Sequence, residues 1–504
     1  MITGLISDPY IISSTVLVLT AVFAAWKHSE LDAIPTVGST TWLGSYFSAV
    51  KNLSGVSGLV QEGYDKHKNA LFKIPTLYTW IIVASGDKFL DEIRKVPEDH
   101  LSAVIAGEDV FKFRFTVGPK ITKNMYHATL IRTGLNRKLA ALFPVVNTEI
   151  VLACDEMFSF VDDEWKSIMA IETIQQIILR GATRVFVGLP LCRNSAWLKF
   201  CSEYATEAFV AGAKINLFPE FMWPLIAIFV TKKNSLTRRA MEYLRPLIRE
   251  RREKWFQNTH TENQADRPED FLQWLVNDGR ETSEWDITQR TMALVFPGLD
   301  TISTSLLQAL YFLAAYPEYL KPLREEVEAL VHEDGWSKST IDKMYKMDSF
   351  MKESHRIGSN IVSLVMMRKV LKDFTFSDGR VVPKGFYIAA PGNAVHHDER
   401  IYDSPNTFDP FRFARLRGQG QDGVKQRVDS SNAQYLVFGL GKHACPGRFF
   451  VSMLQKTTLA RIVMSYDVKL ESGAALESFK RDEGGLFMMV DPTTKILFRK
   501  RTQV

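Results

Sequence analysis

The segment Phe438–Phe450, FGLGKHACPGRFF, constrains this chain most, because it presents one cysteine at the expected start of a helix. Pro446 follows Cys445 directly, and proline is favoured at the first helical position, where its missing N–H costs nothing. Free N–H groups and the positive end of a helix dipole stabilise an anionic sulfur and lower a cysteine pKa from about 8.5. Glycines on both sides leave room for a flat macrocycle to approach the backbone. The pattern predicts a haem-thiolate site, and the competing interpretation is a buried structural cysteine.

Composition and charge exclude several other classes of function. The chain has 504 residues, of which 46% are hydrophobic, and it shows no repeat or low-complexity linker, so it suits a large globular core. The net charge of +5 is small for this length and no basic stripe is interleaved with aromatic residues, so no nucleic-acid partner is expected. Apart from Cys445, the cysteines are Cys154, Cys192 and Cys201. They form no CxxC pair, so we expect ordinary core thiols rather than disulfides or a zinc site.

The N-terminus carries an uncharged run of 18 residues, Pro9–Trp26, followed by Lys27 and His28. Its length reaches the lower end of the range for a membrane-spanning helix, about 17–25 residues. A cleaved signal peptide is the main alternative, although the run is long for one and no small-x-small cleavage site is convincing. A buried core helix is the other alternative. Basic charge on the C-terminal flank, with only Asp8 ahead of the run, predicts a single-pass anchor that leaves the remaining chain in the cytoplasm.

The cysteine segment resembles the haem-binding signature of the cytochrome P-450 superfamily, which reads aromatic-x-x-Gly-x-Arg/His-x-Cys-x-Gly. The matching residues are Phe438, Gly441, His443, Cys445 and Gly447. Most members carry arginine where this chain has His443. In the family that position contacts a haem propionate, and a histidine can still donate a hydrogen bond there.

A second resemblance connects MKESHR with FDPFRF. Glu353 and Arg356 lie three residues apart and therefore share a helix face. An isolated E-x-x-R is usually a surface pair, but in the family such a pair forms a buried network with an arginine that corresponds to Arg412. Because buried charges are costly unless all are paired, the network would hold the loop that carries Cys445. The usual leucine and proline after the pair are replaced here by the segment 357–360, which leaves the shape of the next loop open.

The segment ALVFPGLDTIS, residues 293–303, lies in a long apolar helical run. A glycine, an acid and a hydroxyl are unfavourable by propensity there, and local rules often fail at functional sites. The segment resembles the oxygen-binding kink of the family's central helix. The resemblance implies that Gly298 opens the helix beside the iron and that Asp300 and Thr301 deliver protons to bound dioxygen. Pro297 should deepen the kink by removing one backbone hydrogen bond. A surface bend with a solvated Asp-Thr pair is the alternative.

Haem propionates also require cationic or hydrogen-bonding partners. HATLIR offers His127 and Arg132 near a contact region of the family, although neither of the family's usual spellings is met. Arg368 is a similar candidate, and each of the three is alternatively an ordinary surface or core residue. Arg448 is a further candidate that could instead join Lys442 in meeting the acidic face of a reductase.

The elements expected along the chain are mainly helical, with small β-sheets. We expect strands at 71–75 and 80–84, loop or strand around Phe111, Phe113 and Phe115, helices from about 125 to 319, a hairpin at 373–385, and strands at 485–490 and 495–499. This agrees with the family's prism-shaped, mainly α fold. The aromatic stretch around Phe218 and Trp223 is expected either to pack in the core or, by resemblance, to form a substrate roof against the membrane.

Together these features predict a membrane anchor at 1–30, a hinge at IPTVGS, and a haem-thiolate monooxygenase domain at 31–504. The resemblance implies haem b, attachment to the endoplasmic reticulum membrane, a lipophilic small-molecule substrate, and electrons from an NADPH-cytochrome P-450 reductase, since no G-x-G-x-x-G follows a strand. Several phrases resemble fungal members that oxidise secondary metabolites or xenobiotics, and a terpenoid or steroid-like substrate is preferred. The rival functions are a haem-thiolate isomerase or dehydratase, which would not need Asp300 and Thr301, and a non-enzymatic haem or sterol-binding membrane protein.

Overall fold

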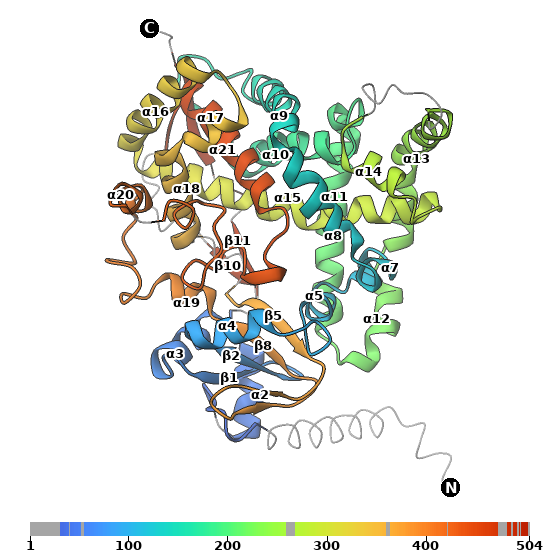
Figure 1. Ribbon diagram of the computed structural model, residues 1–504, viewed down its shortest axis with the longest axis vertical. Helices are drawn as coiled ribbons and strands as arrows, with labels where there is room; N and C mark the ends of the chain where they lie inside the picture. The colour runs from blue at the N-terminus through green and yellow to red at the C-terminus, as the bar shows by residue number, and fades with distance from the viewer. Residues whose placement is uncertain are drawn as a thin grey trace.

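The computed structural model is mainly helical with small sheets, so this part of the predicted fold class is confirmed (Figure 1). It describes residues 31–39, 41–51, 55–258, 268–358, 363–420, 422–471, 481–484, 487–490, 493 and 495–501. The predicted membrane helix over residues 9–26 lies outside the described residues, as do residues 359–360 and 485–486. Those expectations, and the boundary between residues 30 and 31, therefore stay predictions.

A five-stranded sheet occupies the lower part of the molecule in Figure 1. In spatial order its strands are β1 (Leu71–Pro75), β2 (Trp80–Ala84), β8 (Tyr387–Ala390), β5 (Val365–Val370) and β3 (Leu101–Ser102). The two predicted strands are confirmed, and they pair as an antiparallel hairpin with Leu71 opposite Ala84. Every residue of these two strands is buried, as their apolar runs LFKIP and WIIVA suggest. Strand β8 pairs in parallel with β2, so one sheet contains strands from the N-terminal and the C-terminal parts of the chain.

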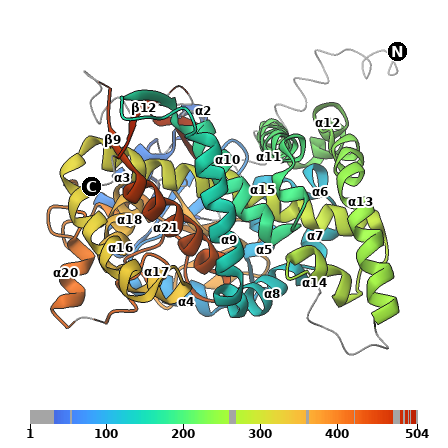
Figure 2. The ribbon, with the colours of Figure 1, turned by 90° about the horizontal axis from the view of Figure 1, so that it is seen from above.

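Long helices form the rest of the molecule and surround one central helix, α15 (Figure 2). They are α9 (Asn136–Met157), α10 (Ala170–Phe186), α11 (Ser195–Asn216), α13 (Lys233–Asn258), α15 (Glu284–Ala315), α16 (Leu320–Asp334), α18 (Tyr345–Gly358) and α21 (Arg448–Ser465). Helix α10 shows why such segments form: Ile174, Ile177 and Ile178 recur at helical spacing and are all buried. Helices α10, α11, α13 and α18 all pack against α15. The central helix is therefore enclosed by its neighbours.

Shorter helical segments connect these elements. They are α2 (Trp42–Lys51), α3 (Ser57–Lys66), α4 (Asp87–Lys95), α5 (Ala103–Phe111), α6 (Phe113–Thr116), α7 (Lys120–Lys123), α8 (Tyr126–Leu130), α12 (Trp223–Val230), α14 (Phe271–Asp278), α17 (Lys338–Lys343), α19 (Gly392–His396) and α20 (Arg412–Gly418). A π-helical turn, η2 (Ile131–Leu135), joins α8 to α9, and 3₁₀ turns lie at η3 (Leu191–Arg193), η4 (Glu220–Met222), η5 (Pro317–Tyr319) and η6 (Gly441–His443).

For the described residues between Met125 and Tyr319, the expected helical region is confirmed with one exception among its strands and helices, the short strand β4 (Lys166–Met169). This strand pairs with β12 (Lys495–Lys500), so that Ile168 lies opposite Ile496, and β9 (Tyr466–Lys469) pairs along the other edge of β12. Because the partner of β4 is more than 300 residues away in the chain, no local pattern announces the strand.

The expectation of loop or strand around Phe111, Phe113 and Phe115 is wrong. Helix α5 ends at Phe111 and α6 begins at Phe113, with Lys112 between them in the left-handed region at φ 54°. This one residue breaks the helix, so the spacing of the phenylalanines reflects two helix ends and not a pleated strand. The rings of Phe111 and Phe113 instead lie edge-on to Phe296 of α15, at centroid distances of 5.6 and 5.5 Å.

The expected hairpin near residue 380 is confirmed as β6 (Phe374–Thr375) and β7 (Val381–Val382). Gly379 supplies the positive φ of 87° that the turn requires. Near the C-terminus, β11 (Phe487–Val490) pairs with β10 (Arg481–Gly484), and β12 spans the last predicted strand. The C-terminal strand predictions are thus confirmed for the residues that the structure describes.

Among the described residues, α15 is the helix whose length and apolar composition would allow it to cross a membrane. However, 72% of its most apolar stretch is buried inside the protein. It belongs to the main hydrophobic core, together with α9, α10, α18 and α21, whereas a second core lies against the five-stranded sheet. We therefore describe α15 as the central core helix.

Candidate active site

The loop that carries Cys445 is shaped by its own backbone. Gly439 and Gly441 adopt positive φ angles of 71° and 74°, which glycine reaches at no steric cost. The backbone N–H of Cys445 donates to the carbonyl oxygen of Phe438 at 2.8 Å, which closes the loop on itself. Helix α21 begins at Arg448, so the predicted helix start at Pro446 is early by two residues. The cysteine therefore lies just before the helix and not on its first turn.

Two opposing effects act on the thiol of Cys445. Burial raises its pKa above the ordinary value for a cysteine, and this is the larger effect. The backbone N–H groups of Gly447 and Arg448 point at the sulfur and, with the Arg448 guanidinium, act to lower the pKa. The expectation that the helix terminus lowers the pKa overall is thus wrong for the chain by itself, because burial outweighs the N–H groups. The predicted N–H donors are nevertheless present.

Two side chains, one from η2 and one from the start of α9, donate hydrogen bonds to the cysteine loop. Arg132 on η2 donates from Nη2 to the carbonyl of Lys442 at 2.9 Å, and Asn136 donates to the carbonyl of Pro446 at 3.1 Å. Arg132 therefore binds the backbone of the cysteine loop through Nη2. Asn136, at the start of α9, is a contact that sequence reasoning missed.

His443, which replaces the usual arginine, lies beside a carboxylate. Its Nε2 is 2.9 Å from Oε2 of Glu98. Burial acts to raise the pKa of Glu98, but bonds from His443, Ser102 and the N–H of Val104 outweigh it and bring the pKa to about 2. Glu98 is thus ionised and ties the end of the α4 region to the cysteine loop. Sequence reasoning missed Glu98, because it lies more than 300 residues before its partner.

The predicted partner His127 is brought to a different neighbour. It is buried, and its Nδ1 lies 3.2 Å from Nη1 of Arg290 on α15. Burial, followed by the charge of Arg290, lowers the pKa of His127 to about 4, so the ring is neutral at pH 7. Arg368 on β5 is also buried, which lowers its pKa to about 10, and its Nη1 donates to the carbonyl of Met367.

Arg448 lies directly behind the cysteine. Its Nη1 donates to the carbonyl of Cys445 at 3.0 Å, and its guanidinium lies 4.2 Å from the ring centroid of Phe449. Its Nε is buried and has no hydrogen-bond partner among the described residues. A buried unpaired N–H of a cation is costly, so this atom marks a place that fits an anionic group.

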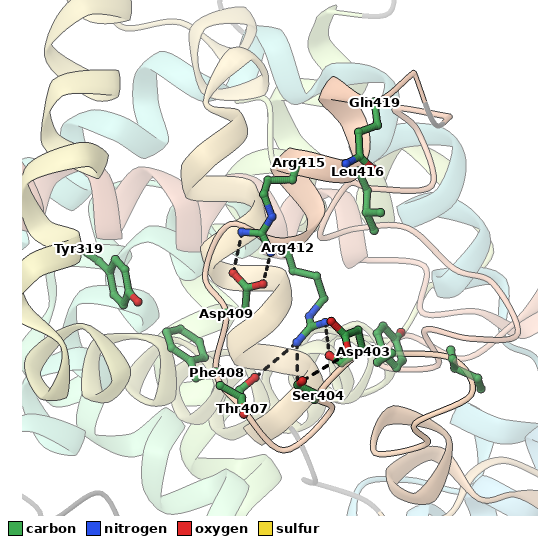
Figure 3. Close-up of a pocket in the computed structure, with 12 residues that line it drawn as sticks. Tyr319, Asp403, Ser404, Thr407, Phe408, Asp409, Arg412, Arg415, Leu416 and Gln419 are labelled. Atoms are coloured by element: carbon green, nitrogen blue, oxygen red, sulfur yellow. Dashed lines mark hydrogen bonds and ion pairs between the residues drawn. The ribbon is translucent and has the colours of Figure 1, made fainter.

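Glu353, Arg356 and Arg412 are brought together in a buried network. Arg356 donates from Nε and Nη2 to the two carboxylate oxygens of Glu353, both at 2.8 Å, and both side chains are 0% exposed. Arg412 donates from Nε to the same oxygens at 3.2 and 3.3 Å. Its other nitrogens reach the backbone carbonyls of Asp403, Ser404 and Thr407 (Figure 3).

The network reaches the cysteine loop through His396. Arg356 donates from Nη1 to the carbonyl of His396, and Nε2 of His396 accepts the backbone N–H of Leu436 at 2.9 Å. Burial lowers the pKa of His396 to about 3, so the ring stays neutral and Nε2 remains an acceptor. Leu436 precedes Phe438, the residue whose carbonyl closes the cysteine loop, by two positions. His396 is therefore the link between network and loop, and no sequence pattern pointed to it.

A cavity of about 570 Å³ is lined by Arg412, one member of this network (Figure 3). Its walls come from the segment 401–419 and from Tyr319, and Arg412 and Arg415 project into it. No residue of the Thr301 turn or of the cysteine loop lines it. This cavity is therefore separate from the place where Cys445 and Thr301 would act.

On α15, Asp300 and Thr301 lie one turn after Pro297. The hydroxyl of Thr301 donates to the carbonyl of Pro297 at 2.8 Å, and Gln175 of α10 donates to Oδ1 of Asp300 at 3.4 Å. Burial raises the pKa of Asp300, so its carboxyl keeps a proton to a higher pH than an exposed aspartate does. Helix α15 continues from Glu284 to Ala315 through Pro297.

Comparison with known proteins agrees with these features. A sequence profile described as Cytochrome P450 matches residues 35–498. A relative from Postia placenta, cytochrome P450 monooxygenase 151, is 37% identical over 99% of this chain and 99% of its own length. Another from the same fungus, cytochrome P450 monooxygenase 71, is 37% identical over 98% of each chain. Ent-kaurene oxidase P450-4 from Gibberella fujikuroi is 30% identical over 95% of this chain and 97% of its own.

Proposed function

This chain belongs to the cytochrome P450 family and is a P450 monooxygenase, and we propose that Cys445 binds the iron of haem b while Asp300 and Thr301 supply protons. The observation that carries this proposal is the coexistence, in one chain, of a cysteine faced by two backbone N–H groups and an Asp-Thr pair at a proline–glycine step of the central helix. Membership of the family implies a haem-thiolate cofactor, a redox partner and a small-molecule substrate.

The residues around Cys445 fit a haem. Among the described residues, no three His, Cys, Asp or Glu side chains gather where they could hold a bare metal ion. One thiolate faced by N–H donors is instead the protein's share of a haem-thiolate site. A Cβ built on Gly447 meets nothing within 4 Å, so the space beside the cysteine is open. The buried, unpaired Nε of Arg448 supplies a cation for a propionate.

The remaining propionate contacts are also proposals. Arg368 is buried with one described hydrogen bond from its guanidinium, which carries five N–H donors, so an anion would stabilise it. His443 lies with Nε2 2.9 Å from Oε2 of Glu98, and we propose that its ring donates a hydrogen bond to a propionate. The carbonyl oxygen of Phe438 accepts the bond that closes the cysteine loop. His127 and Arg132 are less suitable as propionate partners. His127 already contacts Arg290, and Arg132 already donates to the carbonyl of Lys442.

When bound, the haem supplies the activation of dioxygen and the transfer of one oxygen atom to the substrate. The chain supplies the environment. Cys445 donates an anionic sulfur, which the N–H groups of Gly447 and Arg448 stabilise against the cost of burial. Burial raises the pKa of Asp300, so its carboxyl keeps a proton to a higher pH than an exposed aspartate does, and Thr301 carries a hydroxyl that can pass a proton on. Phe111, Phe113 and Phe296 form an aromatic wall beside this turn, which favours apolar ligands.

For the substrate we propose a lipophilic secondary metabolite, with a terpenoid preferred. The support is the apolar wall beside Thr301 and the name of one relative, ent-kaurene oxidase. The proposed electron donor is an NADPH-cytochrome P-450 reductase. Lys442 is exposed on the cysteine loop, where a cation could meet an acidic partner.

We also propose attachment to the endoplasmic reticulum membrane, with residues 1–30 as the anchor and the catalytic domain in the cytoplasm. A second contact with the bilayer is supported by the exposed apolar residues Phe221, Ile228 and Phe229, which are 69%, 74% and 78% exposed. Deleting residues 1–30 should release much of the protein from membranes and leave haem incorporation intact. A truncated protein that binds no haem would show that the anchor is part of the fold.

The decisive experiment for the function has two stages. The reduced carbon monoxide difference spectrum of the purified protein tests thiolate ligation. NADPH consumption with reductase and a compound that changes the iron's spin state then tests oxygen-dependent turnover. A thiolate spectrum with product formed without NADPH or oxygen would indicate an isomerase or dehydratase instead.

A further inference from the structure

The turn of α15 that carries Thr301 receives incomplete support from its own helix. Pro297 has no backbone N–H, so it cannot donate to the carbonyl of Ala293 one turn earlier. Gly298 follows, and its ideal Cβ position meets only the ring of Phe186, at 3.7 Å. The hydroxyl of Thr301 is turned back to the carbonyl of Pro297. External contacts must therefore fix where this turn lies.

Gln455 on α21 provides two such contacts. It is 0% exposed, and its Nε2 donates to the carbonyl of Ile302 at 2.9 Å and to the hydroxyl of Ser305 at 2.6 Å. Ser305 in turn donates to the carbonyl of Thr301 at 2.7 Å. The two N–H groups of one buried amide thus meet two acceptors on the turn that follows Thr301. A continuous hydrogen-bonded series joins α21 to Thr301.

The position of Gln455 in the chain gives this series its meaning. Helix α21 begins three residues after Cys445, and Gln455 lies two turns into it. Its neighbours Met453, Leu454 and Leu459 are buried and apolar, so an amide here is costly unless it is hydrogen-bonded. The buried hydroxyls of Thr457 and Thr458 instead bond carbonyls of α21 itself. Gln455 therefore differs from Thr457 and Thr458 by reaching α15.

We propose that Gln455 is a positioning residue, which fixes the Thr301 turn relative to the helix that follows Cys445. The inference rests on the proposed role of Thr301. Gln455 contacts neither substrate nor cofactor in this proposal. It acts through Ser305 and the backbone of α15.

The first test is hydrogen exchange in the resting holoenzyme, measured on peptides that cover residues 293–308. Gln455→Met keeps the side-chain volume and removes both donors. It should speed exchange around Thr301 roughly twofold to tenfold, the factor that corresponds to one lost hydrogen bond. Thr457→Val is the matched control, since it removes a buried hydroxyl of α21 that does not reach α15. Should Gln455→Met not fold, Ser305→Ala breaks the same series.

The second test is the infrared C–O stretch of the reduced carbon monoxide complex, which senses polar groups beside the distal ligand and needs no substrate. Thr301→Ala should shift the band, and Gln455→Met should shift it in the same direction, while Thr457→Val leaves it in place. In the combined Thr301→Ala, Gln455→Met variant the band should match that of Thr301→Ala alone.

These outcomes separate the inference from the function on which it rests. Wild-type exchange and an unshifted band in Gln455→Met would overturn the inference, as would shifts that simply add in the combined variant. An unshifted band in Thr301→Ala would instead refute the role of Thr301. Exchange around residue 301 would then decide alone whether Gln455 fixes the turn.

Discussion

The Cys445 loop and the Thr301 turn carry the two halves of the proposed chemistry, but they are held in different ways. The loop is shaped by backbone geometry, with two glycines at positive φ and a hydrogen bond between Cys445 and Phe438. The turn is held by side chains from distant helices, Gln175 and Gln455. A short stretch of sequence determines local backbone geometry, whereas contacts between helices depend on residues that lie far apart in the chain. The shape of the loop is therefore easier to predict from its own residues than the place of the turn is.

The largest effect should come from Cys445 itself. Cys445→Ala should abolish the thiolate signature in the reduced carbon monoxide spectrum, because no other described cysteine lies in this loop. Cys154→Ala removes a buried thiol of α9 and should keep that signature. A thiolate spectrum in Cys445→Ala would show that the ligand to the iron does not come from this loop.

Arg412→Ala tests whether the loop depends on the network behind it. Removing this cation leaves the buried carboxylate of Glu353 undercompensated, at a cost of about 3–5 kcal/mol in the free energy of unfolding. Little folded holoprotein should form. Arg415→Ala, on the same helix, breaks an ion pair in which the arginine is 58% exposed and should cost at most about 1 kcal/mol. Equal yields of haem-loaded protein from the two variants would contradict the network.

Thr301→Ala tests the turn and should leave folding intact. Positioned proton transfer typically contributes about 10²–10⁴-fold to a rate, and its loss should divert reduced oxygen to hydrogen peroxide. We expect less product and more peroxide for each NADPH consumed, while Asp300→Asn should mainly slow turnover. Ser303→Ala removes a buried hydroxyl of the same helix and is the control. Unchanged coupling in Thr301→Ala would mean that water or substrate provides the proton path.

The smallest effect should come from Glu98, the side chain that touches the loop from outside. Its pKa falls from 4.5 to about 2 on folding, so the stability it adds is complete above pH 4.5 and lost as the pH falls toward 2. Because its side chain is 36% exposed, Glu98→Gln should lower the free energy of unfolding by about 1 kcal/mol or less. The difference in urea midpoint from the wild type should be smaller at pH 4 than at pH 7. The neighbouring exposed pair of Asp99 provides a control, Asp99→Asn.

The sequence predicted what short stretches determine. The strands of the first hairpin and the long helical region carry local patterns, and the structure places them as expected. The set Glu353, Arg356 and Arg412 came instead from the resemblance to the family, and the structure brings these three side chains together. The sequence could not predict Glu98 or His396, since each acts through a contact with a segment far along the chain. The alternating phenylalanines near residue 112 led to a wrong prediction of loop or strand, because the left-handed residue Lys112 separates two helices and interrupts their helical spacing.

The π-helical turn Ile131–Leu135 has a consequence for how such chains diverge. A π-turn houses one residue more than an α-helical turn, so an insertion can be absorbed at this point without moving the long helix that follows. A sequence motif that requires residues at a fixed spacing no longer matches after such an insertion, even where the contact itself is kept. In three dimensions the extra residue only rotates the side chains on one side of the turn relative to those on the other. Arg132 lies within this turn and reaches the cysteine loop from it, so an insertion on the N-terminal side of the turn need not displace that contact.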